Sequence, residues 1–307
     1  MKILFMGTPE FAVPSLRHLI EAGYEVCGVF TQPDRPKNRG MKLQMPPVKE
    51  LALSYKIPVF QPTSLKDGTA LETIHELAPQ LIVVAAYGRI LPCEILEYPA
   101  LGCINVHSSL LPKYRGAAPI NWAVINGERE TGVTIMHMAQ ELDAGDIIAS
   151  VSTDIDPEET VENLYDRLAE MGGTLLVETV EKLRNGTAER IPQDPGQVTF
   201  APMLSRALSP IDWKKSAKQI HDQIRGLLPW PATTTDILNG RSVKIFSVKE
   251  TGEATSAAPG TILSAGNQGI DIACGDGMVL RILELQAEGK RRMGAGDYLR
   301  GNPIQLH

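Results

Sequence analysis

Residues 2–31 read KILFMGTPEFAVPSLRHLIEAGYEVCGVFT, and this stretch decides how the first half of the chain is interpreted. The continuous apolar run 3–6 predicts a buried strand, because strands covered on both faces do not alternate with polar residues. Apolar residues from Leu16 to Ile20 have helical spacing, and Gly23 is a typical residue just after a helix end. Residues 26–31 then predict a second buried strand. The stretch therefore predicts a β-α-β unit.

The same alternation continues outward from this unit. Further strands are expected at residues 57–60, 81–86, 103–107, 133–138 and 147–151, with helices at 48–55, 71–77 and 161–186. Continuous apolar strands that alternate with amphipathic helices are typical of a parallel sheet covered on both faces. The first half is therefore predicted to be an α/β domain with a Rossmann-like parallel sheet.

The second half has a different pattern. Prolines punctuate a stretch without periodicity around residues 190–208, which is typical of a linker. Beyond it the sequence predicts a helix at 217–228 and then several short strands divided by glycine turns, a pattern of small barrels. We therefore predict a catalytic domain at 1–189, a linker at 190–208 and a smaller OB-like β-barrel domain at 209–307.

Composition excludes several classes of protein. Of the 307 residues, 43% are hydrophobic and 21% are charged, which is ordinary for a folded chain. The longest apolar run, 81–87, is far below the ~20 residues that cross a bilayer, and the N-terminal run is too short for a signal-peptide core. The four cysteines are scattered and form no Cys-x-x-Cys pair, so buried free thiols and no metal site are expected. We expect a cytoplasmic protein without membrane contact.

The turn after the first strand lacks the residues that bind a dinucleotide. That site requires Gly-x-Gly-x-x-Gly, and here the sequence is Gly7-Thr8-Pro9. Pro9 also removes an amide that could bind phosphate, and the chain has no Gly-x4-Gly-Lys-Ser/Thr motif. The sheet is of a nucleotide-binding type, but its phosphate loop is missing.

Two polar residues mark the carboxyl end of the strand at 103–107. Asn105 and His107 share one face because strand side chains repeat every two residues, and ligands of open parallel sheets bind at this end. Together they could polarise a carbonyl and stabilise an oxyanion, and Asp143 could orient the histidine or relay a proton. The alternative is that Asn105 and His107 only close a turn, and that Asp143 belongs to an ordinary Asp-rich turn.

A stiff loop follows the histidine. Its apolar residues Leu110 and Leu111 could line the pocket of a flat aromatic ligand. A Ser/His/Asp hydrolase is disfavoured, because the chain has no Gly-x-Ser-x-Gly elbow and a serine adjacent to its base on a strand points the wrong way.

Charge is distributed unevenly along the chain. The net charge is −6, which argues against a basic coat over the whole protein. Residues 207–307 nevertheless carry 12 Lys and Arg against 10 Asp and Glu, and residues 35–49 hold five cations and no acid. A second basic cluster is Lys290-Arg291-Arg292. Either cluster alone is usually only a solvated face.

Taken together, these motifs resemble the folate-dependent formyltransferases, and within them the branch that acts on charged tRNA. The resemblance covers nearly the whole chain and is carried by NVHSSLLPKYRG at 105–116 and LDAGD at 142–146. The other matching segments are FMGTPEFA at 5–12, VFTQPDRP at 29–36, VAAYGRILP at 84–92, AAPI at 117–120, IDW at 211–213, PWP at 229–231 and APGTIL at 258–263.

The resemblance implies an activity and a set of site residues. The reaction would transfer the formyl group of 10-formyltetrahydrofolate to the α-amino group of methionine on initiator tRNA, with no metal. Asn105, His107 and Asp143 match the family's catalytic residues. The folate-binding segment corresponds to Ser109, Leu110, Leu111 and Pro112, with Ile90 and Leu91 expected in the pterin pocket. The loop from Pro33 to Leu43 would reach the tRNA through Arg35, Lys37, Arg39 and Lys42, and the second domain would also bind tRNA. A monomer is expected.

Other readings of the same motifs remain. One is formyl transfer to an amino sugar on a nucleotide, which predicts a different second domain. Another is a hydrolase that releases formate from 10-formyltetrahydrofolate. The third is a tRNA-binding module without activity, which the presence of Asn105, His107 and Asp143 disfavours.

Overall fold

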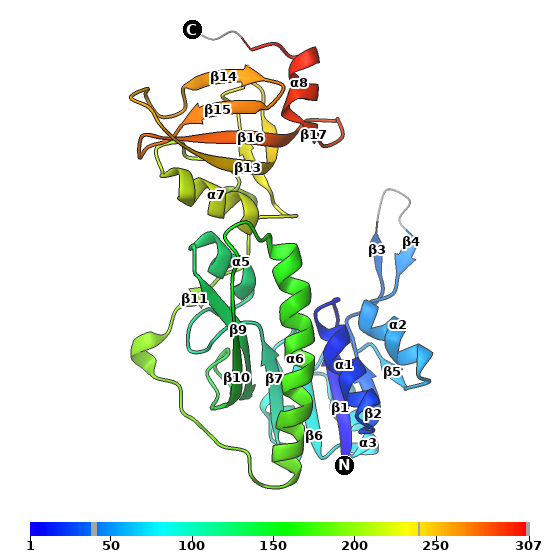
Figure 1. The fold of residues 1–307 in the computed structure, drawn as a ribbon. Helices are drawn as coiled ribbons and strands as arrows, with labels where there is room; N and C mark the ends of the chain where they lie inside the picture. Colours follow the sequence, from blue (N-terminus) through cyan, green and yellow to red (C-terminus); the bar gives the residue numbers. More distant parts are fainter. Residues whose placement is uncertain (38–41, 239, 305–307) are drawn as a thin grey trace. The chain divides into compact units, whose positions relative to one another are not determined.

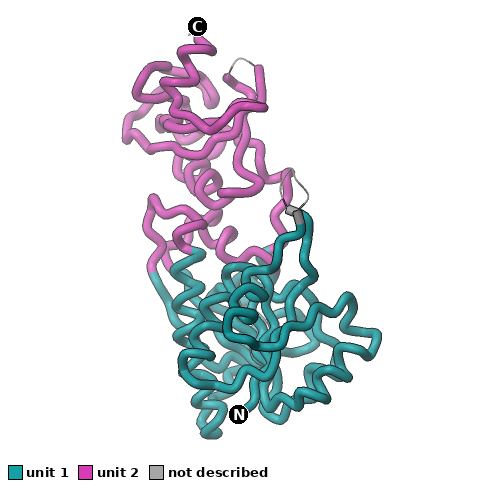
Figure 2. Tube along the Cα trace, turned by 90° about the vertical axis from the view of Figure 1, so that its right-hand side faces the viewer, with its two compact units in different colours: residues 1–116, 131–153, 165–201 teal, residues 117–130, 154–164, 202–307 magenta. Residues whose placement is uncertain are grey.

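The computed structural model describes residues 1–37, 42–238 and 240–304. The chain divides into two compact units, which Figure 2 colours separately. Unit 1 comprises residues 1–116, 131–153 and 165–201, and unit 2 comprises 117–130, 154–164 and 202–307. Two segments of unit 2 therefore come from within the stretch 1–189, which we propose as the catalytic domain on sequence grounds.

Unit 1 is built on a seven-stranded sheet with the order β10-β9-β7-β6-β1-β2-β5 (Figure 1). The strands are β1 (Lys2–Gly7), β2 (Glu25–Phe30), β5 (Val59–Phe60), β6 (Leu81–Ala85), β7 (Cys103–His107), β9 (Glu130–His137) and β10 (Ile147–Asp154). Strand β1 pairs in parallel with both β2 and β6, and β6 pairs in parallel with β7. The chain therefore leaves β1 in one direction along the sheet and returns on its other side, and in open α/β sheets ligands bind at the carboxyl edge of such a reversal.

Helices cover both faces of this sheet. Helix α6 (Val161–Arg184) lies on one face, where its Gly172 is close to Val106 and Val133. Helix α1 (Ala12–Glu21) is beside it and pairs with its Glu170 through Arg17 and His18 (Figure 1). The other face carries a core cluster with α3 (Thr69–Leu77) and α4 (Cys93–Leu96), in which Leu4, Ile82 and Cys103 are almost fully buried.

The predicted fold class is confirmed, with one difference in strand direction. The expected strands at 3–6, 81–86 and 103–107 are present, but β9 runs antiparallel to β7. The sheet is therefore dominated by parallel pairs and is not wholly parallel. The sequence does not indicate the direction of β9. This strand is buried on both faces, so its apolar run is expected whether it lies parallel or antiparallel to β7.

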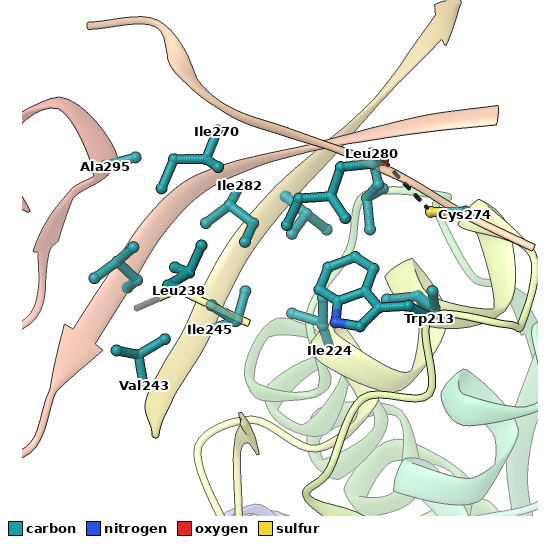
Figure 3. Packing of buried hydrophobic residues seen from close by; sticks show 14 of the residues in the cluster. Trp213, Ile224, Leu238, Val243, Ile245, Ile270, Cys274, Leu280, Ile282 and Ala295 are labelled. Atoms are coloured by element: carbon teal, nitrogen blue, oxygen red, sulfur yellow. Dashed lines mark hydrogen bonds between the residues drawn. The ribbon is translucent and has the colours of Figure 1, made fainter. Parts of the chain in front are cut away.

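Unit 2 contains an antiparallel sheet with the order β12-β13-β16-β15-β14, with β17 paired to β16. Its elements are β12 (Thr233–Thr235), β13 (Val243–Ala254), β14 (Ile262–Gly266), β15 (Gly269–Ala273), β16 (Met278–Ala287), β17 (Met293–Gly294), α7 (Ala217–Gly226) and α8 (Ala295–Gly301). Figure 3 shows its core, in which Trp213 packs near Ile224 of α7, with Ile245 and Leu280 of the sheet also buried. Within the described residues β12 and β14 do not pair, so the strands do not close into a complete ring.

Helix α5 (Pro119–Ile125) and residues 154–164 belong to unit 2 because α7 packs on them. The amide of Asn121 donates to the Gly226 carbonyl at 2.8 Å. Arg225, only 4% exposed, pairs with Asp222 and donates to the carbonyls of Asp156 and Glu159. A buried guanidinium is tolerated only when its donors are satisfied, so these contacts stabilise the arrangement.

The remaining short elements lie outside the two sheets. They are α2 (Pro47–Ser54), a hairpin of β3 (Arg35–Lys37) and β4 (Lys42–Gln44), the pair β8 (Arg115–Gly116) and β11 (Phe200–Ala201), and two 3-10 turns at Pro195–Gln197 and Arg206–Leu208. No helix in the described part of the chain has the length and apolar character needed to cross a bilayer.

The cysteines are free, but they are not all buried. Cys103 and Cys274 are buried as expected, and burial raises the pKa of each thiol to about 12. Cys93, the first residue of the four-residue helix α4, is exposed, contrary to the expectation.

An ion pair across two strands of unit 2 predicts an acid-sensitive contribution to stability. Asp271 and Arg281 lie opposite each other on β15 and β16, and the guanidinium donates to both carboxylate oxygens at 2.6 and 2.9 Å. The Arg281 contact lowers the pKa of Asp271. Asp271→Asn is expected to reduce the free energy of unfolding at pH 7 by about 1–3 kcal/mol, because a charged hydrogen bond is lost in a nearly buried site.

The sign with pH follows from the lowered pKa. The carboxylate stabilises the fold above its unfolded pKa of about 4, and this contribution disappears as the pH falls through the folded pKa. Urea denaturation over a pH series should therefore show the variant and the parent converging at acid pH. Asp297→Asn is the matched control, because the Asp297–Arg300 pair is exposed and such pairs contribute little. A difference between Asp271→Asn and the parent that stays constant with pH would contradict the assignment.

Candidate active site

Strand β7 places Asn105 and His107 at the carboxyl end of the sheet in unit 1. Side-chain alternation puts both on the same face as Cys103, while Val106 faces α6. The strand has neighbours on both sides, because Asn105 is opposite Val84 of β6 and Met136 of β9. The two polar side chains are therefore presented from a rigid central strand.

His107 lies between a backbone carbonyl and a carboxylate. Its Nε2 is 3.0 Å from the Tyr114 carbonyl oxygen, and its Nδ1 is 3.7 Å from Asp143 Oδ2. A carbonyl oxygen only accepts hydrogen bonds, so Nε2 carries a proton and donates it. The imidazole is therefore oriented with Nδ1 toward Asp143. The structure thus brings together His107 and Asp143, which are 36 positions apart in the sequence.

Asp143 is held in a tight loop. Its Oδ2 accepts a hydrogen bond from the Gly116 amide at 2.8 Å, and its backbone is left-handed with φ 52°. Asparagine and aspartate tolerate this conformation better than most residues. Two residues on, a Cβ on Gly145 would lie 1.8 Å from the His137 carbonyl oxygen, so only glycine fits. The motif at 142–146 therefore has a steric as well as a chemical basis.

The Asn105 side chain is half-buried and is not used to maintain the fold. No group among residues 1–37, 42–238 and 240–304 forms a hydrogen bond with its amide. A carboxamide offers two donor hydrogens and one acceptor oxygen. This amide is therefore available to a ligand, on the same face as His107.

The loop after His107 is held in place by hydrogen bonds to a buried threonine. Thr134 of β9 lies opposite His107, donates to the Ser109 carbonyl and accepts from the Leu111 amide. Ser109 is fully buried and its hydroxyl donates to the Lys113 carbonyl at 2.7 Å. These bonds fix the path of residues 109–112, in which Leu110 and Pro112 are half-buried and Leu111 is buried.

The other two residues expected in a pterin pocket have contrasting environments. Ile90 is 75% exposed, whereas Leu91 is 3% exposed and belongs to the core cluster on the α3 face. Ile90 therefore has free apolar surface for a ligand, and Leu91 packs in the core.

The basic stretch includes two short strands that pair as a hairpin. Strands β3 and β4 pair antiparallel, with Lys37 opposite Lys42. Polar residues without alternation did not predict these strands. Arg35 is exposed, whereas Arg39 lies outside the described residues.

A polar cluster holds the base of this hairpin. Lys49 Nζ is 2.8 Å from both carboxylate oxygens of Asp34 and 2.8 Å from Gln61 Oε1. Lys49 lowers the pKa of Asp34, and Gln61 contributes in the same direction. Lys49 is therefore neutralised within the fold, and it is the one cation of the stretch 35–49 that is not among the four residues expected to bind tRNA.

Two family profiles match this chain. The Formyl transferase profile matches residues 1–180, and the profile of the formyl transferase C-terminal domain matches 203–303. This chain belongs to the formyl transferase family.

Relatives of this formyltransferase match it over its whole length. It is 49% identical over 306 residues to a methionyl-tRNA formyltransferase of Halalkalibacterium halodurans, covering 100% of this chain and 96% of the relative. It is 51% identical over 305 residues to a methionyl-tRNA formyltransferase of Desulforamulus reducens, covering 99% and 96%. A solved N-formyltransferase from Helicobacter canadensis, bound to folinic acid and dTDP-3-aminofucose, has a TM-score of 0.71 at 22% identity and covers 94% of this chain and 99% of that one.

The structure also shows polar residues of this formyltransferase that the sequence did not indicate. Gln193 donates to the carbonyls of Asp143 and Gly145, both at 2.8 Å, and Arg115 donates to Gln193. Gln193 lies in an aperiodic stretch whose pattern predicts a linker, so no local signal identifies it. Among the described residues, no group of three or more His, Cys, Asp or Glu side chains is arranged to hold a metal ion.

Proposed function

We propose that this formyltransferase transfers the formyl group of 10-formyltetrahydrofolate to the α-amino group of methionine on initiator tRNA. One observation carries the proposal. The chain is 49% and 51% identical, over nearly its full length and through both domains, to two proteins named methionyl-tRNA formyltransferase. Substrate specificity involves residues from the whole chain, so full-length identity at this level is stronger support than a shared fold.

The donor is supported by the family and by the site. The Helicobacter canadensis structure contains folinic acid, which is a formyl-bearing folate, and it has the same fold as this chain. We propose that Ser109, Leu110, Leu111 and Pro112, with Ile90 and Leu91, form the folate pocket here. Leu110 and Ile90 offer apolar surface for a flat ring, and Ser109 and Leu91 hold that surface in place from the core.

We propose that Asn105 and His107 stabilise the charge that develops during the transfer. A free α-amine has a pKa of about 8, so part of it is neutral and nucleophilic at pH 7. Its nitrogen attacks the formyl carbon, and negative charge moves onto the formyl oxygen. The free amide of Asn105 donates to that oxygen, and the imidazole of His107, whose Nε2 is held by the Tyr114 carbonyl, lies on the same face of the strand beside it.

Asp143 completes the reaction by moving a proton. The new nitrogen–carbon bond leaves the attacking amine with an extra proton, and the departing folate nitrogen needs one. Asp143 accepts hydrogen bonds at Oδ2 from Gly116, and no group in the described residues bonds to Oδ1. We propose that this carboxylate takes the amine proton and returns it to the leaving nitrogen, while it keeps His107 oriented.

Two alternative acceptors are less well supported. The Helicobacter canadensis N-formyltransferase binds dTDP-3-aminofucose, a nucleotide-linked amino sugar, but that protein is only 22% identical to this chain. Release of formate to water would not require the matched C-terminal domain at 203–303. Because the proposed acceptor is a charged tRNA, we propose that the protein acts in the cytoplasm, as a monomer.

The donor reaction distinguishes a transferase from a hydrolase. The protein is mixed with 10-formyltetrahydrofolate, with or without methionyl initiator tRNA, and tetrahydrofolate formation is followed by absorbance. Rapid formation of tetrahydrofolate in an amount equal to the amount of methionyl initiator tRNA supplied supports the proposal. Formate release at the same rate without tRNA would show that the protein is a hydrolase.

Removing the hairpin cations is expected to weaken tRNA binding selectively. Replacing Arg35, Lys37, Arg39 and Lys42 with alanine should raise the KM for methionyl-tRNA by about tenfold or more, because each lost phosphate contact weakens binding. The dependence of log KM on log salt should flatten by about one unit per lost contact. The KM for 10-formyltetrahydrofolate should not change, and steady-state kinetics at several salt concentrations measure all three effects.

The control removes the same charge elsewhere in unit 1. Lys2, Lys56, Lys66 and Lys182 are exposed, and alanine at these four positions should leave the salt dependence as it is in the parent. If both quadruple variants behave alike, the effect is one of net charge and the hairpin has no special role.

A further inference from the structure

Residues 190–201, which we name the strap, cross the loops that face His107. The strap lies within unit 1 and contacts the Asp143 loop at one end and the Tyr114 loop at the other. Its path begins with paired backbone bonds between Ile191 and Ile147 at 2.8 and 2.9 Å. A stretch that only linked two domains would not need such bonds.

Gln193 fastens the strap to the Asp143 loop in a single possible orientation. Its Oε1 accepts from Arg115 Nε and Nη2 at 3.0 and 2.8 Å, and its Nε2 donates to the carbonyls of Asp143 and Gly145 at 2.8 Å. A guanidinium only donates and a carbonyl only accepts, so the amide cannot be reversed. Arg115 is only 7% exposed, and a buried donor without an acceptor is costly. The Gln193 oxygen that accepts from it is therefore important to the fold.

The other end of the strap fastens Tyr114, whose carbonyl orients His107. The Tyr114 amide donates to Thr199 Oγ1 at 2.9 Å, and the Arg115 amide donates to the Thr199 carbonyl at 2.9 Å. Strand β11 then pairs with β8, where a Cβ on Gly116 would lie 2.7 Å from the Ala201 carbonyl oxygen. Gly116 is also the residue whose amide binds Asp143.

Both residues that face His107 have left-handed backbone conformations. Tyr114 has φ 61° and Asp143 has φ 52°, in a region that bulky side chains such as tyrosine rarely adopt and that aspartate tolerates better. Such conformations cost of order 1 kcal/mol or more each and persist only where surrounding contacts enforce them. The strap supplies hydrogen bonds to both residues.

We propose that the strap is a positioning element for the reaction, and that Gln193 is its positioning residue for Asp143. This inference rests on the proposed function of Asp143 as the group that moves the proton. Gln193 does not touch the substrates. It holds the backbone of residues 143–145, and so sets the position of the carboxylate relative to His107.

The expected effect is a loss of turnover without a loss of binding. Displacing a reacting group by about 1 Å can cost about 10²-fold in rate. Gln193→Ala should therefore reduce kcat by about 10- to 100-fold, while the KM for 10-formyltetrahydrofolate and for methionyl-tRNA stays within about twofold. Gln193→Glu keeps an acceptor for Arg115 but loses both donors to the loop carbonyls, so it should be as impaired as Gln193→Ala.

The matched control is Gln197→Ala, four residues along the same strap. Within the described residues the Gln197 side-chain amide bonds only to Asp194, and both residues are exposed. This variant should keep the parental kcat. Activity retained by Gln193→Glu would assign the effect to Arg115 and overturn the proposal for the Asp143 loop, as would a parental kcat in Gln193→Ala.

Two further measurements separate positioning from general destabilisation. If Gln193 acts through Asp143, adding Gln193→Ala to Asp143→Asn should lower kcat by less than about twofold, because coupled residues are not additive. Hydrogen exchange followed by mass spectrometry should show faster exchange at residues 139–147 in Gln193→Ala and not in Gln197→Ala. Full additivity, or unchanged exchange at 139–147, would overturn the inference. The hydrogen-exchange measurement does not depend on activity. An inactive parent would disprove the proposed function, and the exchange data would still decide whether Gln193 holds residues 139–147 in place.

Discussion

Replacing Asp143 with asparagine is expected to reduce kcat for formyl transfer by about 10²–10⁴-fold, the range that general acid–base groups supply. Asparagine preserves the shape of the side chain and an oxygen for the Gly116 amide, which is 2.8 Å from Oδ2. It lacks the charge and the ability to take a proton. Binding of 10-formyltetrahydrofolate, measured by equilibrium titration, should therefore stay close to the parental value.

Asp146→Asn provides the comparison within the same loop. Asp146 pairs with Arg190 at 3.0 Å on the surface, and 65% of the Arg190 side chain is exposed, so its loss should leave kcat nearly unchanged. If Asp143→Asn retains parental turnover at every pH, the carboxylate does not move the proton. If Asp146→Asn is equally inactive, the loop as a whole is sensitive and Asp143 has no special role.

Removing the side chain of Asn105 is expected to cost about 10²–10³-fold in kcat, the usual effect of losing one oxyanion donor. Asn105→Ala removes the donor, and Asn105→Asp replaces it with an acceptor of the same shape that repels the developing charge. Both should be impaired, with the aspartate variant at least as slow. Since the Asn105 amide has no partner in the described residues, neither change should lower the melting temperature by more than a few degrees.

His107→Ala should fall in the same range, for a related reason. It removes the imidazole that shares a face with Asn105 and that Asp143 faces at 3.7 Å. Single-turnover kinetics with saturating donor separate these losses from binding. Near-parental turnover in any of these variants would remove that residue from the proposed catalytic set.

Much of the fold is predictable because buried parallel strands leave a strong local pattern. The apolar runs at 3–6 and 81–86 correspond to β1 and β6, and the polar pair at 105 and 107 ends β7. Side-chain alternation along that strand is enough to place Asn105 and His107 on one face. The glycine-divided strands of the second half likewise correspond to the antiparallel sheet of unit 2.

What the sequence did not predict depends on contacts between distant residues. Helix α5 and residues 154–164 join unit 2 through Arg225, which reaches the carbonyls of Asp156 and Glu159 across more than 60 positions. Gln193 lies in a proline-rich stretch without periodicity and acquires its role from carbonyls 48 and 50 positions away. The Asp34–Lys49 ion pair similarly gives Lys49 a structural role that the run of cations at 35–49 does not indicate. Patterns along the chain indicate local secondary structure and burial. These long-range contacts change neither, so the sequence pattern does not reveal them.

The most direct test of the proposed function compares acceptors under identical conditions. The protein and 10-formyltetrahydrofolate are incubated with methionyl initiator tRNA, with methionyl elongator tRNA, with a nucleotide-linked amino sugar, or with free methionine, and the formylated product is identified by mass spectrometry. We predict that kcat/KM for methionyl initiator tRNA exceeds that for the amino sugar and for free methionine by at least about 10³-fold, or about 4 kcal/mol, with the formyl group on the α-amine of methionine. Faster formylation of the amino sugar, or no formylation of methionyl-tRNA at all, would contradict the proposal.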